Sequence, residues 1–246
     1  MKYAIISDIH SNYEALSVVI ERIKNEKVDK IFCCGDIVGY GPDPDKCIDL
    51  IKKEHIVSIL GNHDVAVLGR ADLSWFNKDA IEAIIINKKL ISFDNFNFLD
   101  SLNTFVEGNS EILFVHGSPR DNIYEYLMDF SSLKINAKFM KQKICFCGHT
   151  HFPLLYSFDP KTEKSEIFYT DKKNVFEIES DKKYIINVGS VGQPRDGDNR
   201  ACYVIFDLEK KIVKFNREEY NISFTQKKML LLNMPEFLIT RLDFGE

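Results

Sequence analysis

Five short apolar runs in this chain each stop at a cluster of polar residues, and these junctions constrain the fold more than any other feature. The runs cover residues 3–7, 30–34, 56–60, 112–115 and 144–147. The polar residues that follow them are Asp8 and His10, Asp36, Asn62 to Asp64, His116, and His149 and His151. Runs of this length are typical of buried strands, and open α/β sheets bind ligands at the carboxyl ends of their strands. The sequence therefore predicts one site where these strand ends meet.

The first half of the chain alternates such runs with helical patterns. Ser11 and Glu14 form a predicted capping box for an amphipathic helix over about residues 12–26. Asp43 and Pro44 are a predicted N-cap and first turn of a second helix, which runs toward residue 53. Residues 69–102 have a helical pattern rich in isoleucine and aromatic side chains, which favours core packing or a helical cap over the site at about 70–102.

The second half has a different pattern. From residue 153 onward, short apolar runs are separated by Asp, Lys, Asn and Gly, which predicts antiparallel hairpins and a second sheet. Residues 229–244 form a predicted helical tail that is interrupted at Pro235. No linker, repeat or low-complexity tract divides the chain. We therefore expect a single domain over residues 1–246, of the α/β class, with two sheets flanked by helices.

Composition limits the partners and the compartment. The net charge of -5 gives the chain no general attraction to nucleic acid or to anionic membranes. No apolar run approaches the roughly 18 residues of a membrane span, and the sequence begins directly with a strand pattern instead of an export signal. Five of the six cysteines lie inside apolar runs, which favours a reduced, cytoplasmic protein over a disulfide framework. The sequence does not determine the oligomeric state.

The histidines indicate a metal site. All six except His55 lie at the predicted strand ends, together with carboxylate and amide side chains. A mixed nitrogen and oxygen donor set suits first-row divalent cations, here manganese, iron, zinc or nickel. Seven such donors exceed the needs of one ion, so we expect two ions about 3.5–4 Å apart that share a carboxylate. A mononuclear site, or a thiolate zinc site at Cys145, Cys147 and His149, is the alternative.

The motifs at these junctions resemble a known family. They are DIH at 8–10, GDIVGYGP at 35–42, GNHD at 61–64, HGSP at 116–119 and GHTH at 148–151. In this order they resemble the five motifs of the calcineurin-like metallophosphoesterases. Residues 187–203 are also similar to a segment of bacterial and archaeal members related to diadenosine tetraphosphatases and serine/threonine protein phosphatases. The resemblance implies a four-layer α/β/β/α sandwich with two mixed sheets and a dinuclear site at the sheet edges.

The resemblance also implies roles for individual residues. Asp8, His10 and His151 would hold one metal ion, Asn62, His116 and His149 the other, and Asp36 would bridge them. A bridging hydroxide would attack a phosphate ester. His63 would protonate the leaving oxygen, and Asp64 would orient the His63 ring, unless Asp64 is only a helix cap.

The substrate is less defined. Tyr40 and Arg195 are the candidate substrate-binding residues, and Arg120 and Arg200 lie in similar loops. Phosphate monoesters, diesters, nucleotide-derived esters and phosphoproteins all suit this chemistry. The alternative to an enzyme is a non-catalytic metal-binding scaffold of the same fold.

Overall fold

Two six-stranded sheets carry the predicted strand ends. The computed structural model describes residues 1–171 and 173–246. In spatial order, the first sheet contains β3 (Val57–Ser58), β2 (Lys30–Cys33), β1 (Lys2–Ile6), β11 (Ala201–Asp207), β12 (Ile212–Glu218) and β9 (Val175–Glu177). The second contains β4 (Phe105–Asn109), β5 (Ile112–Val115), β6 (Ile144–Cys147), β10 (Lys183–Asn187), β7 (Leu154–Phe158) and β8 (Ser165–Tyr169). Both sheets are mixed: β1, β2 and β3 are parallel in one, as are β5, β6 and β10 in the other.

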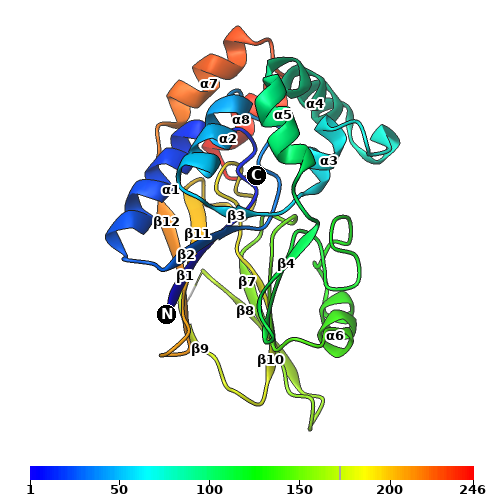
Figure 1. Cartoon of the computed structure of the whole chain (residues 1–246), viewed down its shortest axis with the longest axis vertical. Helices are drawn as coiled ribbons and strands as arrows, with labels where there is room; N and C mark the ends of the chain where they lie inside the picture. The colour runs from blue at the N-terminus through cyan, green and yellow to red at the C-terminus, as the bar shows by residue number, and fades with distance from the viewer. Residues whose placement is uncertain (172) are drawn as a thin grey trace.

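Helices cover the outer faces of both sheets (Figure 1). They are α1 (Tyr13–Asn25), α2 (Pro44–Lys53), α3 (Asn62–Val67), α4 (Lys78–Leu90), α5 (Phe93–Asp100), α6 (Phe130–Phe139), α7 (Ile222–Leu231) and α8 (Glu236–Thr240), with short 3₁₀ turns η1 (Leu73–Trp75) and η2 (Arg241–Asp243). Helix α6 lies beyond the second sheet, and α1, α2 and α7 lie on the side of the first. Among the helices described, none combines the length and the apolar character that crossing a membrane requires.

Alternation along the strands explains the layers. On β1, Ala4 and Ile6 face the helices of the first sheet, whereas Tyr3 and Ile5 face the second sheet. The two sheets meet through aromatic rings, since Phe32 of β2 stacks on Phe114 of β5 with ring centroids 4.0 Å apart. The predicted four-layer sandwich is therefore confirmed, and its apolar interior fixes both sheets relative to the shared edge where the strands end.

The second half of the chain does not form a sheet of its own. Strand β11 pairs antiparallel with β1, and β12 and β9 extend the same first sheet. Only β7, β8 and β10 join the second sheet, where they lie beside β5 and β6. The predicted hairpins exist, but an apolar pattern defines a strand without defining its neighbour, so the division between sheets had to come from the tertiary structure.

One of the two predicted helix caps is wrong, and the other is confirmed in position only. The N-cap of α1 is Asn12, whose side chain accepts the Ala15 N–H, whereas the Ser11 hydroxyl donates to Asn87 Oδ1 at 2.5 Å. Asp43 occupies the N-cap position of α2 but makes no side-chain cap bond; its carboxylate pairs with Lys46 and Lys228. Ser11 and Asp43 therefore both contact residues distant in sequence, Asn87 and Lys228.

Candidate metal centre

The predicted ligands converge on the edge where the two sheets meet. Asp8 and His10 follow β1, Asp36 follows β2, Asn62 begins α3, His116 follows β5, and His149 and His151 follow β6. Loops of the two sheets are joined there directly, because the His149 N–H lies 3.2 and 3.1 Å from the two carboxylate oxygens of Asp8. All seven side chains are buried, so their polar atoms face one another instead of solvent.

Four of these residues form a first cluster of donors. In Asp8, His10, Asp36 and His151, one ligand atom from each lies within 4.8 Å of all the others. The Nε2 atoms of His10 and His151 are 3.0 Å apart, and His151 Nε2 is 3.2 Å from Asp8 Oδ1. Such a group of buried imidazoles and carboxylates suits a divalent first-row cation.

A second cluster forms around His116. Its Nε2 atom is 3.0 Å from Asn62 Oδ1 and 3.1 Å from His149 Nδ1. Asp36 Oδ2 belongs to both clusters, since it lies 3.4 Å from His116 Nε2 and 3.5 Å from His10 Nε2. One carboxylate oxygen thus stands between two sets of imidazole nitrogens.

Backbone carbonyls orient three of the rings. His116 Nδ1 lies 2.8 Å from the Cys34 carbonyl, His151 Nδ1 lies 2.6 Å from the Gln193 carbonyl, and His149 Nε2 lies 3.2 Å from the Tyr124 carbonyl. A carbonyl only accepts, so each of these ring nitrogens is the donor. In the neutral rings the opposite nitrogen then turns a lone pair toward the cluster, as metal-ligating histidines do.

Burial and the neighbouring charges shift the pKa values of the clustered groups. Burial raises the pKa of the Asp36 carboxyl, but His116 and His63 outweigh it and hold that pKa well below its usual range. Burial lowers the pKa of His149 to about 3. Burial also lowers the pKa of His116, but Asp36 raises it to about 9, so in the metal-free protein His116 holds a proton toward the second cluster. Facing lone pairs need a positive charge between them, which a metal ion would supply in place of that proton.

The ligand loops are conformationally strained. Asp8, His10, Asp36, His149 and His151 all have positive φ, between 48° and 68°. Non-glycine residues rarely adopt this left-handed conformation, which costs roughly 1–3 kcal/mol each and persists where the surroundings enforce it. Five of the seven predicted ligands therefore hold their side chains in place through strained backbone.

The rings around His63 place it beside the first cluster. Its ring centroid is 4.9 Å from that of His10, 4.4 Å from Tyr40 and 5.2 Å from Phe76. The His63 N–H donates to Asp36 Oδ1 at 2.8 Å, so the backbone of His63 positions the shared carboxylate. Burial lowers the pKa of the His63 ring to about 4. His63 Nδ1 has no hydrogen-bond partner among the described residues.

Asp64 makes different contacts from those that the sequence suggested. Its carboxylate accepts the backbone N–H groups of Ile37, Val38 and Gly61 at 3.3, 3.0 and 2.9 Å. It therefore ties the loop after Asp36 to the start of α3, and burial raises its pKa to about 7. These contacts support the capping alternative and leave the proposed orientation of His63 by Asp64 without a hydrogen bond in the described residues.

The candidate substrate-binding residues lie side by side. The Arg195 guanidinium is centred 5.5 Å from the Tyr40 ring, and that ring packs 4.6 Å from His10. Arg195 Nη2 donates to Gln193 Oε1 at 2.8 Å, whereas its buried Nε has no hydrogen-bond partner among the described residues. By contrast, Arg200 pairs with Asp198 and Arg120 with Glu125.

Sequence reasoning missed two tyrosines at the second cluster. Tyr126 stacks on the His149 ring with centroids 3.7 Å apart, and Tyr124 supplies the carbonyl that orients the same ring. Trp75 of η1 packs edge-on against Tyr124 at 5.0 Å, which brings the segment after α3 to this side of the site. The signal in the sequence was the Tyr124-Glu125-Tyr126 stretch, which four residues separate from the HGSP motif.

Asn87 on α4 is a further missed residue. Fully buried, it accepts from the Ser11 hydroxyl and the Gly39 N–H and donates to the Gly41 carbonyl. It thus connects α4 to the loops that follow Asp8 and Asp36.

We expect Asn87→Ala to lower the free energy of unfolding by about 1–3 kcal/mol, because buried loop groups would lose their partners. Urea unfolding measures this loss. Asn97→Ala, on the exposed face of α5, is the control and should change the value by less than about 0.5 kcal/mol. Similar small effects in both variants would show that the Asn87 contacts do not stabilise the loops.

The thiolate alternative has no support from the geometry. Cys145 and Cys147 point into the core between the second sheet and α6. Burial raises the pKa of both thiols, so neither is a ready thiolate ligand.

Fold and site together define the class of the protein: an α/β sandwich whose strand ends enclose a buried cluster of metal-binding donors. The chain belongs to the calcineurin-like phosphoesterase superfamily, whose domain model matches residues 1–211. The family is metal-dependent, and the chain is a hydrolase that acts on phosphate esters.

Individual proteins are similar to this chain over different lengths. An uncharacterized protein of Methanocaldococcus jannaschii is 42% identical over 247 residues, which cover 98% of this chain and 97% of the relative. The crystal structure of a metallophosphoesterase from Sphaerobacter thermophilus has a TM-score of 0.89 at 38% identity and covers 100% of this chain and 99% of its own. A symmetrical bis(5'-nucleosyl)-tetraphosphatase of Buchnera aphidicola is 36% identical, but over only 26% of this chain and 24% of that enzyme.

Proposed function

We propose that this protein hydrolyses phosphate mono- or diesters, including nucleotide-derived ones, with two divalent metal ions bound by seven residues. Asp8, His10 and His151 would hold one ion and Asn62, His116 and His149 the other. The observation that carries the proposal is the position of Asp36 Oδ2, 3.5 Å from His10 Nε2 and 3.4 Å from His116 Nε2. When bound, the two cations would supply the attacking hydroxide and neutralise charge on the phosphate oxygens.

His63 is our candidate for the acid that protonates the leaving oxygen. Its ring lies beside the first cluster but takes no part in either donor set. With a pKa of about 4, the ring is neutral at pH 7 in the free protein. The proposal therefore requires the negative charge of the bound phosphate to raise this pKa, as a nearby anion does for an imidazole. Asp64 would act on His63 only indirectly, by fixing the backbone from which the ring projects.

Arg195 is our candidate for a second contact with the phosphate group. In the described part of the chain its guanidinium bonds the neutral Gln193 side chain and forms no ion pair, and a partly buried cation without a counterion is costly. An anionic substrate would supply that counterion, and Tyr40 would hold the guanidinium in place through its ring.

The test is a screen of the purified protein against phosphate esters with manganese, iron, zinc and nickel. Hydrolysis of bis-p-nitrophenyl or p-nitrophenyl phosphate that depends on about two bound ions per chain supports the proposal. Two bound ions without hydrolysis of any ester would favour the alternative, a non-catalytic metal-binding scaffold. One tightly bound ion with full activity would favour a mononuclear site.

We also propose that residues 70–102 cap the site within a single domain that spans the chain. Helix α4 packs on α2 and α3, while Phe76 contacts His63 and Trp75 contacts Tyr124.

The six buried free thiols agree with the expected reducing, cytoplasmic location.

Trp75→Ala is expected to change the ratio of kcat/KM values for large and small esters by about 2- to 10-fold, through loss of one aromatic contact. Metal content should stay the same. Phe93→Ala provides the control, because Phe93 lies on α5 in the same segment and is 78% exposed. An equal rate loss on every ester, accompanied by lower stability, would show that the segment only completes the core.

A further inference from the structure

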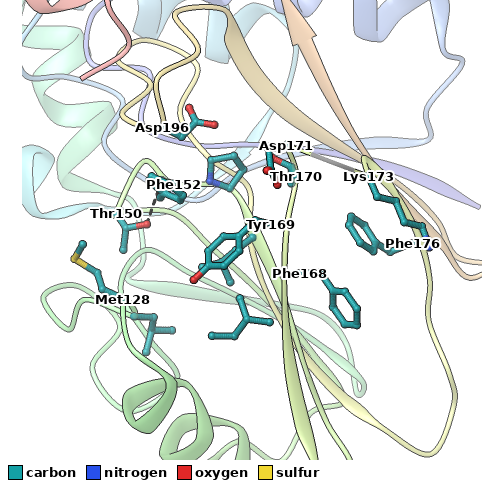
Figure 2. A pocket seen from close by; sticks show the side chains of 14 residues that line it. Met128, Thr150, Phe152, Phe168, Tyr169, Thr170, Asp171, Lys173, Phe176 and Asp196 are labelled. Carbon is teal, nitrogen blue, oxygen red and sulfur yellow. Dashed lines mark hydrogen bonds between the residues drawn. The ribbon is translucent and has the colours of Figure 1, made fainter.

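A cavity lies beside the loops that carry several of the candidate metal ligands. It has a volume of about 770 Å³ and lies between the loop at 127–128, the segment 150–154 and strand β8 with the residues after it. Figure 2 shows the Tyr169 ring beside Phe152, with Met128 and Thr150 on one side and Asp171 and Lys173 on the other. A space of this size exceeds what one phosphate group needs and lies within the range of small-molecule sites.

The walls of this cavity continue directly from the site. Thr150 lies between the predicted ligands His149 and His151 and is itself part of the wall. Leu127 and Met128 follow Tyr126, which stacks on His149, and Asp196 follows Arg195. Three separate loops that reach the metal centre therefore each extend into the cavity.

The lining favours a flat and largely apolar group. Nine of the 14 lining residues are apolar or aromatic. Phe152 and Tyr169 pack edge-to-face with centroids 6.3 Å apart, yet their side chains are 37% and 51% exposed, so ring surface remains open to a ligand. Aromatic side chains bind planar rings by stacking.

The polar groups of the cavity include an acceptor for a ligand N–H group. Among the described lining residues the charged ones are Asp171, Lys173 and Asp196. Asp196 Oδ2 pairs with Arg217, whereas its buried Oδ1 has no hydrogen-bond partner among the described residues. An unpaired acceptor of this kind suits an N–H donor on the ligand. The amino or ring N–H groups of a nucleobase are such donors.

We propose that this cavity is a nucleoside subsite, which binds the base of a phosphate ester whose phosphate lies at the metal centre. Tyr169 and Phe152 would stack on the base, and Asp196 would accept one of its N–H groups. This inference rests on the proposed function, because it assigns the substrate class of that same centre.

The test compares two esters that differ only in the nucleoside. One is the p-nitrophenyl ester of adenosine 5'-phosphate, and the other is p-nitrophenyl methyl phosphate. In Tyr169→Ala the KM for the adenosine ester should rise about 5- to 100-fold, the usual range for loss of one base-stacking side chain. The KM for the methyl ester should change by less than about twofold, since methyl does not reach the cavity. Tyr169→Phe keeps the ring and should restore the wild-type value.

A matched control exists on the same sheet. Phe105 lies on β4, at the edge opposite β8, and is 47% exposed. Phe105→Ala should leave both KM values unchanged. Equal KM changes for the two esters in Tyr169→Ala, or no change in either, would overturn the subsite.

Direct binding separates this inference from the proposed function. Calorimetry with adenosine alone, on wild type and Tyr169→Ala, reports the cavity without any hydrolysis. If neither ester is cleaved yet adenosine binds and Tyr169→Ala abolishes that binding, the subsite stands and the proposed function fails. If wild type cleaves the methyl ester but does not bind adenosine, the subsite fails alone. A phosphoserine peptide cleaved with a lower KM than the adenosine ester, in a manner sensitive to Tyr169→Ala, would assign the cavity to a peptide and overturn the proposal.

Discussion

Asp36→Asn should give a folded protein that binds neither metal ion tightly and has lost hydrolysis of phosphate esters. The carboxylate oxygen Oδ2 lies between His10 Nε2 and His116 Nε2, so both donor clusters depend on its charge. Asparagine keeps the shape and can still accept the His63 N–H, but it removes the negative charge. Changes to residues that merely support a ligand cost about 10–100-fold in affinity or activity. Loss of a shared ligand should therefore exceed about 100-fold for each ion.

Elemental analysis and metal titration of the variant measure this directly. His151→Ala is the informative comparison, because His151 belongs to the first cluster only and its loss should chiefly weaken one ion. Asp159→Asn, in an exposed turn where Asp159 accepts the Lys161 N–H, controls for a loss of charge elsewhere. An Asp36→Asn protein that retains two tight ions and normal turnover would show that Asp36 does not bridge them.

The positions of the site residues could be predicted because strand ends determine them. An apolar run such as 30–34 predicts a strand, and the glycine after it predicts where the strand ends, so Asp36 is placed at a sheet edge without knowledge of the rest of the fold. The structure then places Asp8, His149 and His151 within contact distance of one another across the two sheets. Local sequence was sufficient here because every candidate ligand lies within a few residues after the end of a strand.

Features that depend on distant partners could not be predicted in this way. The Ser11 hydroxyl bonds Asn87, 76 residues away, although Glu14 made a local capping box attractive. Asp64 likewise binds the N–H groups of Ile37 and Val38 instead of the neighbouring ring. A polar side chain near a helix start can satisfy either a local or a distant group, and the sequence does not say which.

The residues that pack around the candidate ligands, and those that line the cavity, could not be predicted for the same reason. Tyr126 reaches His149 because the loop after β5 folds back over the strand end, and no periodicity records that path. Tyr169 belongs to β8, whose pattern predicts a strand but not that it borders the loop of His149 and His151. The sequence thus predicted which residues form the candidate site, whereas the shape of the surrounding cavity depends on tertiary packing.

His63→Ala is expected to lower kcat/KM on an alkyl phosphate ester by about 10²–10⁴-fold while both metal ions remain bound. This is the usual contribution of general acid catalysis and corresponds to roughly 3–5.5 kcal/mol of transition-state stabilisation. An alkoxide needs a proton as it leaves, whereas p-nitrophenolate is already a stable anion. The loss on a p-nitrophenyl ester should therefore be much smaller than the loss on the alkyl ester.

A second variant guards against a packing defect, because the His63 ring is buried between Tyr40 and Phe76. His63→Gln fills more of that space and cannot act as an acid near neutral pH, so it should show the same dependence on the leaving group as His63→Ala. Metal content, measured on both variants, distinguishes an acid from a ligand. If both esters suffer the same penalty, His63 positions the substrate instead of protonating it. If one ion is lost, His63 belongs to the donor set, and the leaving oxygen must receive its proton from another group or from water.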